Sequence, residues 1–172
     1  YISNLSPNYY DTIAVGLLEK RGAADEYGKR AIDNIIALSD RYKAEAERIG
    51  RRDIADILTH IPRYGARNFR EALQFFRIVH YALWLEGNYH NTVGRFDKYM
   101  YPYFKADFEA GKISREFAQE LMDCIWVKLN DLNKVRDAAS AEGFAGYSLF
   151  QNLIAGGQTE EGLDATNDLS FM

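Results

Sequence analysis

The chain has 172 residues and a formal net charge of −4, and hydrophobic residues make up 47% of it, which is enough for one domain with a sizeable core. Its charges form no long runs of one sign, so nothing favours nucleic acid or an anionic membrane surface as a partner. A single cysteine excludes an internal disulfide framework, and no apolar run reaches the length needed to span a membrane. A cytoplasmic location is therefore the expectation.

The first sixty residues predict an extended entry followed by helices. Pro7 disfavours helix at the residue before it, so residues 4–11 are expected to form a turn or extended segment that leads into a helix over 12–18. Apolar residues at three- and four-residue steps then predict an amphipathic helix over 25–49. A shorter helix is expected over 51–60.

The next element is the most apolar one in the chain. Asn68 is expected to cap a largely buried helix over 69–83. Residues 83–86 either continue that helix or form a buried strand, because periodicity does not separate the two for a short apolar run. His80 on this element is expected to be a core histidine with satisfied hydrogen bonds, and His60 at the end of the preceding helix a surface residue.

Residues 86–103 follow this apolar element and combine an imidazole, two amides, a guanidinium and a carboxylate with two glycines. The polar residues are Asn88, His90, Asn91, Arg95 and Asp97. A packed element followed at once by polar side chains is how binding sites are commonly built, although a simple polar turn has the same pattern. We expect Arg95 and Asp97 to form an internal ion pair that supports this loop.

Two further helices are expected after this stretch. One helical turn is predicted over 96–101, and a second helix begins at Pro102 and ends at Gly111. Ser114 caps the next helix, and its apolar stripe places Cys124 in the core as a small hydrophobe with no catalytic role. The stripe consists of Phe117, Leu121, Cys124, Ile125, Leu129 and Leu132.

The last third of the chain is less regular. Small residues predict a mobile connection over 137–146, followed by a strand over 147–155 that ends at two glycines. Residues 164–172 have the polar start of a helix. The three histidines, His60, His80 and His90, have no metal-ligand spacing, so no metal is expected.

Two long motifs resemble one enzyme family. Residues 94–102, Gly-Arg-Phe-Asp-Lys-Tyr-Met-Tyr-Pro, are similar to the GRFDQYMYP segment of glycyl radical enzymes of the pyruvate formate-lyase-like and glycerol dehydratase-like branch. Residues 150–159 and 162–170 resemble the QNLIVGGQT and GRDATNELS segments of the same enzymes. The motifs occur in the family's order, and the resemblance covers essentially the whole chain.

The resemblance implies a fold. It is an α/β fold in which residues 1–172 form a mainly helical N-terminal part with a few strands, belonging to the family's ten-stranded α/β barrel. The family's thiyl-forming Cys with a neighbouring Glu and its radical glycine motif do not occur in this sequence. The expectation is therefore a partial pyruvate formate-lyase-like domain, an internal piece of a larger enzyme that is inert alone.

The resemblance also implies a function, which is radical cleavage of a C–O, C–N or C–C bond in a small polar metabolite by a dehydratase, a lyase or a formate acetyltransferase-like enzyme. No cofactor would be bound here; the glycyl radical would be installed elsewhere by an S-adenosylmethionine iron–sulfur activating enzyme, and the full-length protein would be a homodimer. The alternative is a small, non-catalytic helical interaction module.

The same resemblance suggests three substrate-binding residues. His90 matches a substrate-contacting histidine of the glycerol dehydratase-like members, and Asn91 matches its polar neighbour, which would orient the substrate. Asn4 stands where those members have a second histidine that contacts substrate. This departure weakens glycerol as the substrate.

Overall fold

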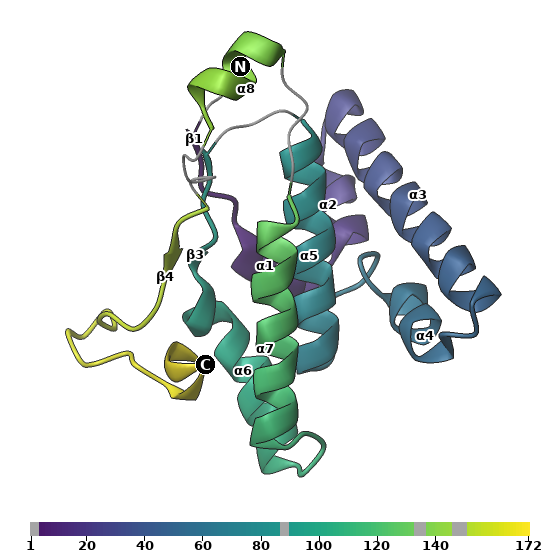
Figure 1. Ribbon diagram of the computed structural model, residues 1–172. Helices are drawn as coiled ribbons and strands as arrows, with labels where there is room; N and C mark the ends of the chain where they lie inside the picture. Colours follow the sequence, from purple (N-terminus) through teal and green to yellow (C-terminus); the bar gives the residue numbers. More distant parts are fainter. Residues whose placement is uncertain (1–3, 87–89, 133–136, 146–150) are drawn as a thin grey trace.

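The structure, a computed structural model, describes residues 4–86, 90–132, 137–145 and 151–172. Helices dominate it, with a few short strands along one side (Figure 1). The helices are α1 Tyr9–Val15, α2 Leu17–Ala23, α3 Glu26–Arg48, α4 Arg52–His60, α5 Phe69–Leu85, α6 Phe96–Glu109, α7 Arg115–Asn130 and α8 Ala138–Gly143, with a 3-10 helix, η1, at Asp168–Phe171. The strands are β1 Asn4–Leu5, β2 His90–Asn91, β3 Gly94–Arg95 and β4 Leu153–Ile154.

The strands form a small parallel arrangement around one extended segment, residues 90–95. In this segment β2 pairs in parallel with β1, and β3 pairs in parallel with β4. Residues 90–95 therefore lie between two strands that come from opposite ends of the chain. A mainly helical chain with a few parallel strands agrees with the α/β expectation.

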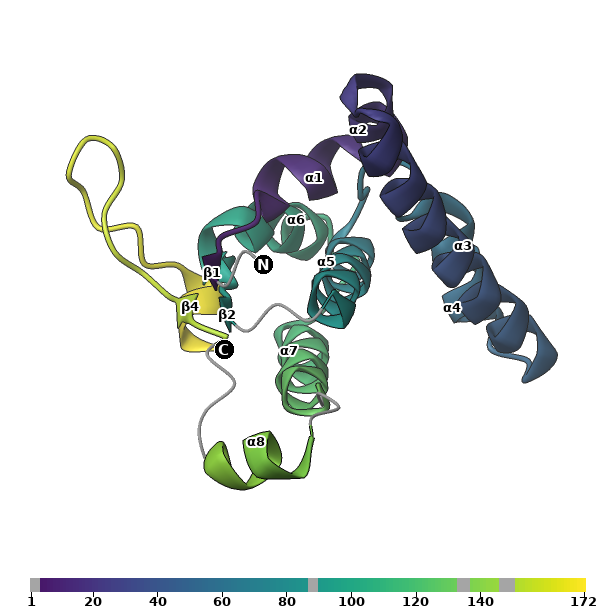
Figure 2. The ribbon, with the colours of Figure 1, turned by 90° about the horizontal axis from the view of Figure 1, so that it is seen from above.

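Helix α5 is the buried centre of the molecule. It packs against α1, α3, α6 and α7, and α5 and α7 lie side by side in Figures 1 and 2. Phe69, Phe75 and Phe76 on this helix are each 0% exposed. Burying a large apolar side chain stabilises a fold by roughly 1.5–3 kcal/mol, so this helix supplies much of the driving force for folding.

The polar groups at the start of α5 are satisfied. The predicted cap is confirmed, because Asn68 Oδ1 accepts from the Glu71 backbone N–H at 2.9 Å. The Phe69 N–H, which has no partner within the helix, donates to Asp107 of α6 at 2.8 Å. The helix continues through Leu85 rather than changing into a strand, which settles the alternative left open at 83–86.

Helices α3 and α4 form an arm that projects from this body (Figure 2). The amphipathic helix predicted over 25–49 is confirmed as α3, capped by Asp25, whose side chain accepts from the Gly28 N–H. The chain returns to the body through Gly65, where a Cβ would lie 1.9 Å from the Ala14 carbonyl oxygen. Only glycine allows that close approach.

Three of the predicted boundaries are wrong. The first helix begins at Tyr9, capped by Asn8, and breaks at Gly16 into α1 and α2. Residues 96–109 form a single helix with Pro102 inside it, where two elements were predicted. Pro102 and Lys98, whose carbonyl loses the usual N–H partner, both lie on the exposed face, so water can replace that hydrogen bond.

The last segments also differ from expectation. The predicted mobile connection contains α8, whose cap Asp137 accepts from the Ser140 N–H at 3.0 Å. Of the strand predicted over 147–155, only β4 is observed, and residues 147–150 lie outside the described part of the chain. The helix predicted over 164–172 is reduced to the single 3-10 turn η1.

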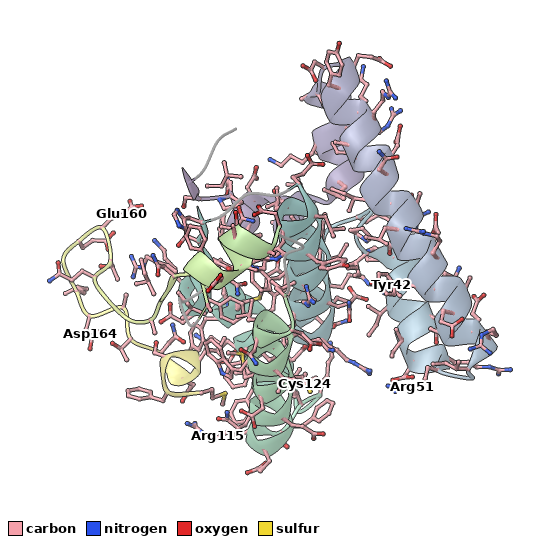
Figure 3. The ribbon with its side chains drawn as sticks, turned by 45° about the horizontal axis from the view of Figure 1, so that its top comes forward. Tyr42, Arg51, Arg115, Cys124, Glu160 and Asp164 are labelled. Carbon is pink, nitrogen blue, oxygen red and sulfur yellow. The ribbon has the colours of Figure 1, made fainter. Side chains whose placement is uncertain are left out.

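Helix α7 buries only part of the predicted stripe: Ile125, Leu129 and Leu132 are buried, whereas Phe117 and Cys124 are exposed. Its buried residues are Ala118, Met122, Ile125 and Leu129. Cys124 is exposed, and Phe117 is 43% exposed, so the prediction that Cys124 lies in the core is wrong. Apolar residues occupy two neighbouring faces of this helix, and periodicity alone does not say which of them meets α5. Cys124 is labelled on α7 in Figure 3.

We therefore expect Cys124 to react readily with a thiol reagent in the folded 172-residue chain. Because its sulfur is exposed, the rate should lie within about tenfold of the rate in urea. Absorbance of the released thiolate, followed with and without urea, measures both rates. Protection of a hundredfold or more in the folded state would show that another part of the chain covers this face.

Candidate functional site

Of the polar stretch 86–103 that the sequence singles out, residues 90–95 form an extended segment, residues 96–103 belong to α6, and residues 87–89, with Asn88, lie outside the described part of the chain. Thr92 N–H donates to the Leu5 carbonyl at 2.9 Å, which extends the β1–β2 pairing. On the other side, the Asn152 carbonyl accepts from the Val93 N–H at 2.8 Å and from the Thr92 hydroxyl at 2.7 Å. Residues 90–95 are thus fixed from both sides by backbone hydrogen bonds.

Two of the predicted substrate-binding residues lie directly opposite each other in this arrangement. In the parallel register Asn4 pairs with His90, and Leu5 pairs with Asn91. Residues more than eighty positions apart in the chain are therefore neighbours across one strand pair. His90 is partly buried, and Asn91 is 0% exposed.

Asn91 has an unusual environment. Its amide nitrogen and its amide oxygen are both buried, and neither has a hydrogen-bond partner among the described residues. A buried amide without partners costs roughly 1–3 kcal/mol, and such groups are rare in folded proteins. A polar ligand that donates to the oxygen and accepts from the nitrogen would remove this cost.

Arg95 and Asp97 do not form the ion pair that was predicted. Both contact the backbone of the same residue, on its two sides: Arg95 Nη2 donates to the Gly156 carbonyl at 3.0 Å, and the Gly156 N–H donates to Asp97 Oδ2 at 2.5 Å. Arg95 also donates to the Gln158 carbonyl at 2.9 Å. The two side chains diverge because Arg95 ends a strand while Asp97 lies in the first turn of α6.

The loop that they hold depends on its two glycines. Gly156 has a φ of 68°, in the left-handed region, and a Cβ there would lie 3.0 Å from the Thr166 hydroxyl oxygen. Asp97 is 2% exposed and also accepts from the Ser170 hydroxyl at 2.5 Å. Its carboxylate therefore connects the loop, η1 and the start of α6.

A second polar group, which sequence reasoning only partly anticipated, lies beside the strands. His80 is 0% exposed, and the expectation of a satisfied core histidine is confirmed. Its Nδ1 lies 2.6 Å from the Tyr9 hydroxyl, and its Nε2 lies 2.7 Å from Gln151 Oε1. The Gln151 amide nitrogen donates onward to the Leu129 carbonyl at 3.0 Å.

The direction of these hydrogen bonds follows from the last acceptor. Because the Leu129 carbonyl can only accept, Gln151 presents its NH₂ there and its oxygen to His80. His80 therefore donates from Nε2 and accepts the Tyr9 hydroxyl proton at Nδ1. A neutral imidazole of one tautomer satisfies every group in this chain of hydrogen bonds.

Burial shifts the pKa values of His80 and Tyr9 in opposite directions. Burial lowers the pKa of His80 below its ordinary value, the hydrogen bond to Gln151 partly opposes this shift, and the charge of Arg77 lowers the pKa further. Burial also raises the pKa of the Tyr9 hydroxyl. Both groups are therefore neutral at physiological pH. Tyr9 and Gln151 were not singled out in the sequence, because no local spacing relates them to His80.

A pocket among the described residues lies elsewhere. Its volume is about 700 Å³, and it lies between α6 and the loop before η1, with Lys98, Tyr101, Glu160 and Asp164 in its wall. Figure 3 labels Glu160 and Asp164 on this loop. None of Asn4, His90 and Asn91 lines it.

Two classes of site receive no support from the residues that the structure describes. No group of three or more His, Cys, Asp or Glu side chains is arranged to hold a metal ion there. Within the same residues, no helix combines the length and the hydropathy of a membrane span.

His60, expected at the surface, is partly exposed and contacts the Gly65 carbonyl through Nε2 at 2.9 Å.

Comparison with known proteins supports the family resemblance. The family model described as PFL-like, pyruvate formate lyase-like, matches residues 18–172. Isethionate sulfite-lyase of Oleidesulfovibrio alaskensis is 35% identical over 153 residues, which cover 87% of this chain and 18% of the relative. The chain thus spans about a fifth of the length of this curated relative.

Solved structures agree in fold. A structure concerned with 1,2-propanediol dehydration in Roseburia inulinivorans is 41% identical with a TM-score of 0.88, over 99% of this chain and 25% of that one. The glycerol-bound B12-independent glycerol dehydratase from Clostridium butyricum is 35% identical with a TM-score of 0.81, again over 99% of this chain and 25% of that one. The chain matches about a quarter of each structure.

The lowered pKa of His80 predicts a dependence of stability on pH. Below about pH 6.5 the unfolded chain binds a proton at this residue while the folded chain does not, so the free energy of unfolding falls as the pH is lowered. One such group contributes at most about 1.4 kcal/mol per pH unit. Urea unfolding of the wild type and of His80→Phe at pH 7.5 and 5.5 measures this. The variant should show the smaller loss of stability between the two pH values, and equal losses would contradict the prediction.

Proposed function

The chain belongs to the pyruvate formate lyase-like family of glycyl radical enzymes, and we propose that it is the part of such an enzyme that presents His90 and Asn91 to a small polar substrate. The relatives over this part include dehydratases and lyases, such as isethionate sulfite-lyase, (2S)-3-sulfopropanediol dehydratase and glycerol dehydratase. The proposed reaction is cleavage of a C–O, C–N or C–C bond in a small hydroxylated metabolite.

The observation that carries this proposal is the buried, unpaired amide of Asn91. It lies next to His90 on a strand that is fixed from both sides, and Asn4 is the register partner of His90. A substrate hydroxyl can both donate to the amide oxygen and accept from the amide nitrogen. Rigidly held polar groups of this kind orient a ligand at little entropic cost.

His90 has the chemistry of a proton acceptor in this proposal. Expelling a leaving group from the carbon next to a hydroxylated one is easier when the hydroxyl is deprotonated, and an imidazole is suited to accept that proton near neutral pH. Asn91 does not titrate, so it holds the substrate and does not act as a base. Asn4, like Asn91, would contribute an uncharged contact.

The radical chemistry belongs to residues that this sequence does not contain. In the family, a glycyl radical installed by an S-adenosylmethionine iron–sulfur activating enzyme is relayed to a cysteine thiyl, which would take a hydrogen atom from substrate carbon. The single cysteine, Cys124, lies on α7 outside the strand segment and does not fit that role. In this proposal the full-length enzyme is a cytoplasmic homodimer, and the present strands belong to its ten-stranded barrel.

The substrate class follows from the polar residues. A site with Asn at positions 4 and 91 and one histidine favours a neutral or hydroxylated molecule over a strongly charged one. Asn4 replaces a histidine of the glycerol dehydratase-like members, so we do not assign glycerol. The alternative of a small non-catalytic interaction module is less favoured, because homology to radical dehydratases and lyases spans most of the chain.

The decisive test of His90 is turnover of the full-length enzyme that carries this segment. His90→Gln keeps hydrogen bonding but removes the base, so we expect turnover to fall on the order of 10²–10⁴-fold while the yield of glycyl radical is unchanged. Radical yield is measured by electron paramagnetic resonance. His60→Gln, on α4, is the matched control and should retain normal turnover. Normal turnover in His90→Gln would remove this residue from the site.

Asn91 allows a test that separates binding from folding. Replacement of a buried amide without partners by an apolar group of similar size is neutral or stabilising, so Asn91→Leu should raise the free energy of unfolding of the 172-residue chain by about 1 kcal/mol. The same variant should raise KM in the full-length enzyme on the order of tenfold or more, since one substrate hydrogen-bonding group is lost. A destabilised variant with normal KM would show that the amide serves the fold.

A further inference from the structure

The hydrogen bonds of His80 reach both strands that flank the segment 90–95. Tyr9, on one side of the imidazole, begins α1, four residues after Leu5 of β1. Gln151, on the other side, precedes β4 by two positions. His80 itself lies on α5, the helix that precedes β2 in the chain. One imidazole thus connects the three parts of the chain that build the strand arrangement.

The imidazole is held in a fixed plane. Its ring stacks on Phe76 with an interplanar angle of 20° and on Trp84 with an angle of 27°. These residues lie one helical turn before and after it on α5, so the ring has aromatic neighbours above and below. Both ring nitrogens therefore point in set directions, toward Tyr9 and toward Gln151.

These contacts sit next to the hydrogen bonds that join the strands. Gln151 is adjacent to Asn152, whose carbonyl accepts from the N–H groups of Val93 and Gly94 at 2.8 and 3.3 Å and from the Thr92 hydroxyl at 2.7 Å. Tyr9 follows the short segment that carries the Leu5 carbonyl, the acceptor of the Thr92 N–H. A movement of Gln151 would therefore shift the Asn152 carbonyl relative to residues 90–95, and a movement of Tyr9 would shift the Leu5 carbonyl.

We propose that His80 is a positioning residue for the substrate site, setting the position of β1 through Nδ1 and that of β4 through Nε2. The effect on substrate rests on the function proposed above, while the positioning of the strands does not. The two hydrogen bonds of the imidazole act separately, because each nitrogen holds a different strand. Loss of the Nδ1 contact loosens the side of the site that carries Asn4, and loss of the Nε2 contact loosens the side that carries Asn152.

Two substitutions of His80 each keep one of its two hydrogen bonds and remove the other. In His80→Asn, the amide oxygen lies near the position of Nδ1 and can still accept from Tyr9. In His80→Gln, the amide nitrogen lies near the position of Nε2 and can still donate to Gln151. The readout is hydrogen exchange of two single amides in the folded 172-residue chain, measured by NMR. Thr92 N–H reports the contact with β1, and Val93 N–H reports the contact with β4.

The expected result is a crossed pattern. His80→Gln should speed exchange at Thr92 on the order of tenfold, with a smaller change at Val93, and His80→Asn should do the reverse. Tyr9→Phe should reproduce the pattern of His80→Gln, because it removes the same hydrogen bond. Gln151→Leu should reproduce that of His80→Asn. Imidazole ¹⁵N shifts of the wild type should show a protonated Nε2 and an unprotonated Nδ1.

A matched control tests whether the pattern is only lost stability. Leu58→Ala removes a buried side chain of α4, away from the strands, and should change exchange at Thr92 and Val93 by the same factor. If the His80 variants also change both amides equally, His80 is an ordinary core residue and the proposal is wrong. If a His80 variant is too unstable to be measured, Tyr9→Phe and Gln151→Leu provide the same test with a smaller loss of stability.

Substrate measurements then separate this proposal from the proposed function. In the full-length enzyme, both His80 variants should raise KM with unchanged radical yield. A crossed exchange pattern together with unaltered KM would keep the mechanical role and remove the link to substrate. A crossed pattern in an enzyme whose His90→Gln variant has normal turnover would mean that the proposed function fails while the positioning of the strands stands.

Discussion

The structure depends on the burial of α5. A helix that meets other elements on most of its faces has little water available for its polar groups, so each of them needs a protein partner. Glu71 pairs with Arg67 at 2.5 Å, the Phe69 N–H reaches Asp107, and His80 bonds to Tyr9 and Gln151. Each of these partners comes from another element or from the chain that leads into α5. The hydrogen bonds of the Phe69 N–H and of His80 thus tie α5 to α6, to α1 and to the segment that leads to β4.

Local sequence signals were sufficient where the structure is decided locally. The caps Asn68 and Ser114 act within their own first turns, and both predictions are confirmed. The face of α7 and the continuous helix through Pro102 depend on what lies opposite each residue, which no spacing reveals. Cys124 was assigned to the core for that reason, although it is exposed while Ile125 and Leu129 of the same predicted stripe are buried.

For the candidate site, too, the local arrangement could be predicted from the sequence and the long-range contacts could not. The sequence places His90, Asn91, Arg95 and Asp97 in one segment, and the structure keeps them together on β2, β3 and the start of α6. The resemblance adds Asn4, and the parallel register sets it opposite His90. The partners of Arg95 and Asp97 lie about sixty residues away, on the backbone of Gly156, which no sequence pattern could single out. Long-range partners of this kind follow from topology, which a single sequence does not state.

The contrast between His80 and Asn91 bears on function. Both are fully buried polar side chains near the same strands, yet His80 has a partner at each nitrogen and Asn91 has none among the described residues. If Asn91 served only the fold, an apolar residue would serve it better by roughly 1–3 kcal/mol. A buried polar group with hydrogen-bond partners stabilises the fold. One without partners lowers the stability, and it forms hydrogen bonds only when a ligand binds. The missing partners of Asn91, next to the well-bonded His80, are therefore the physical argument for our proposal that this strand pair faces a substrate.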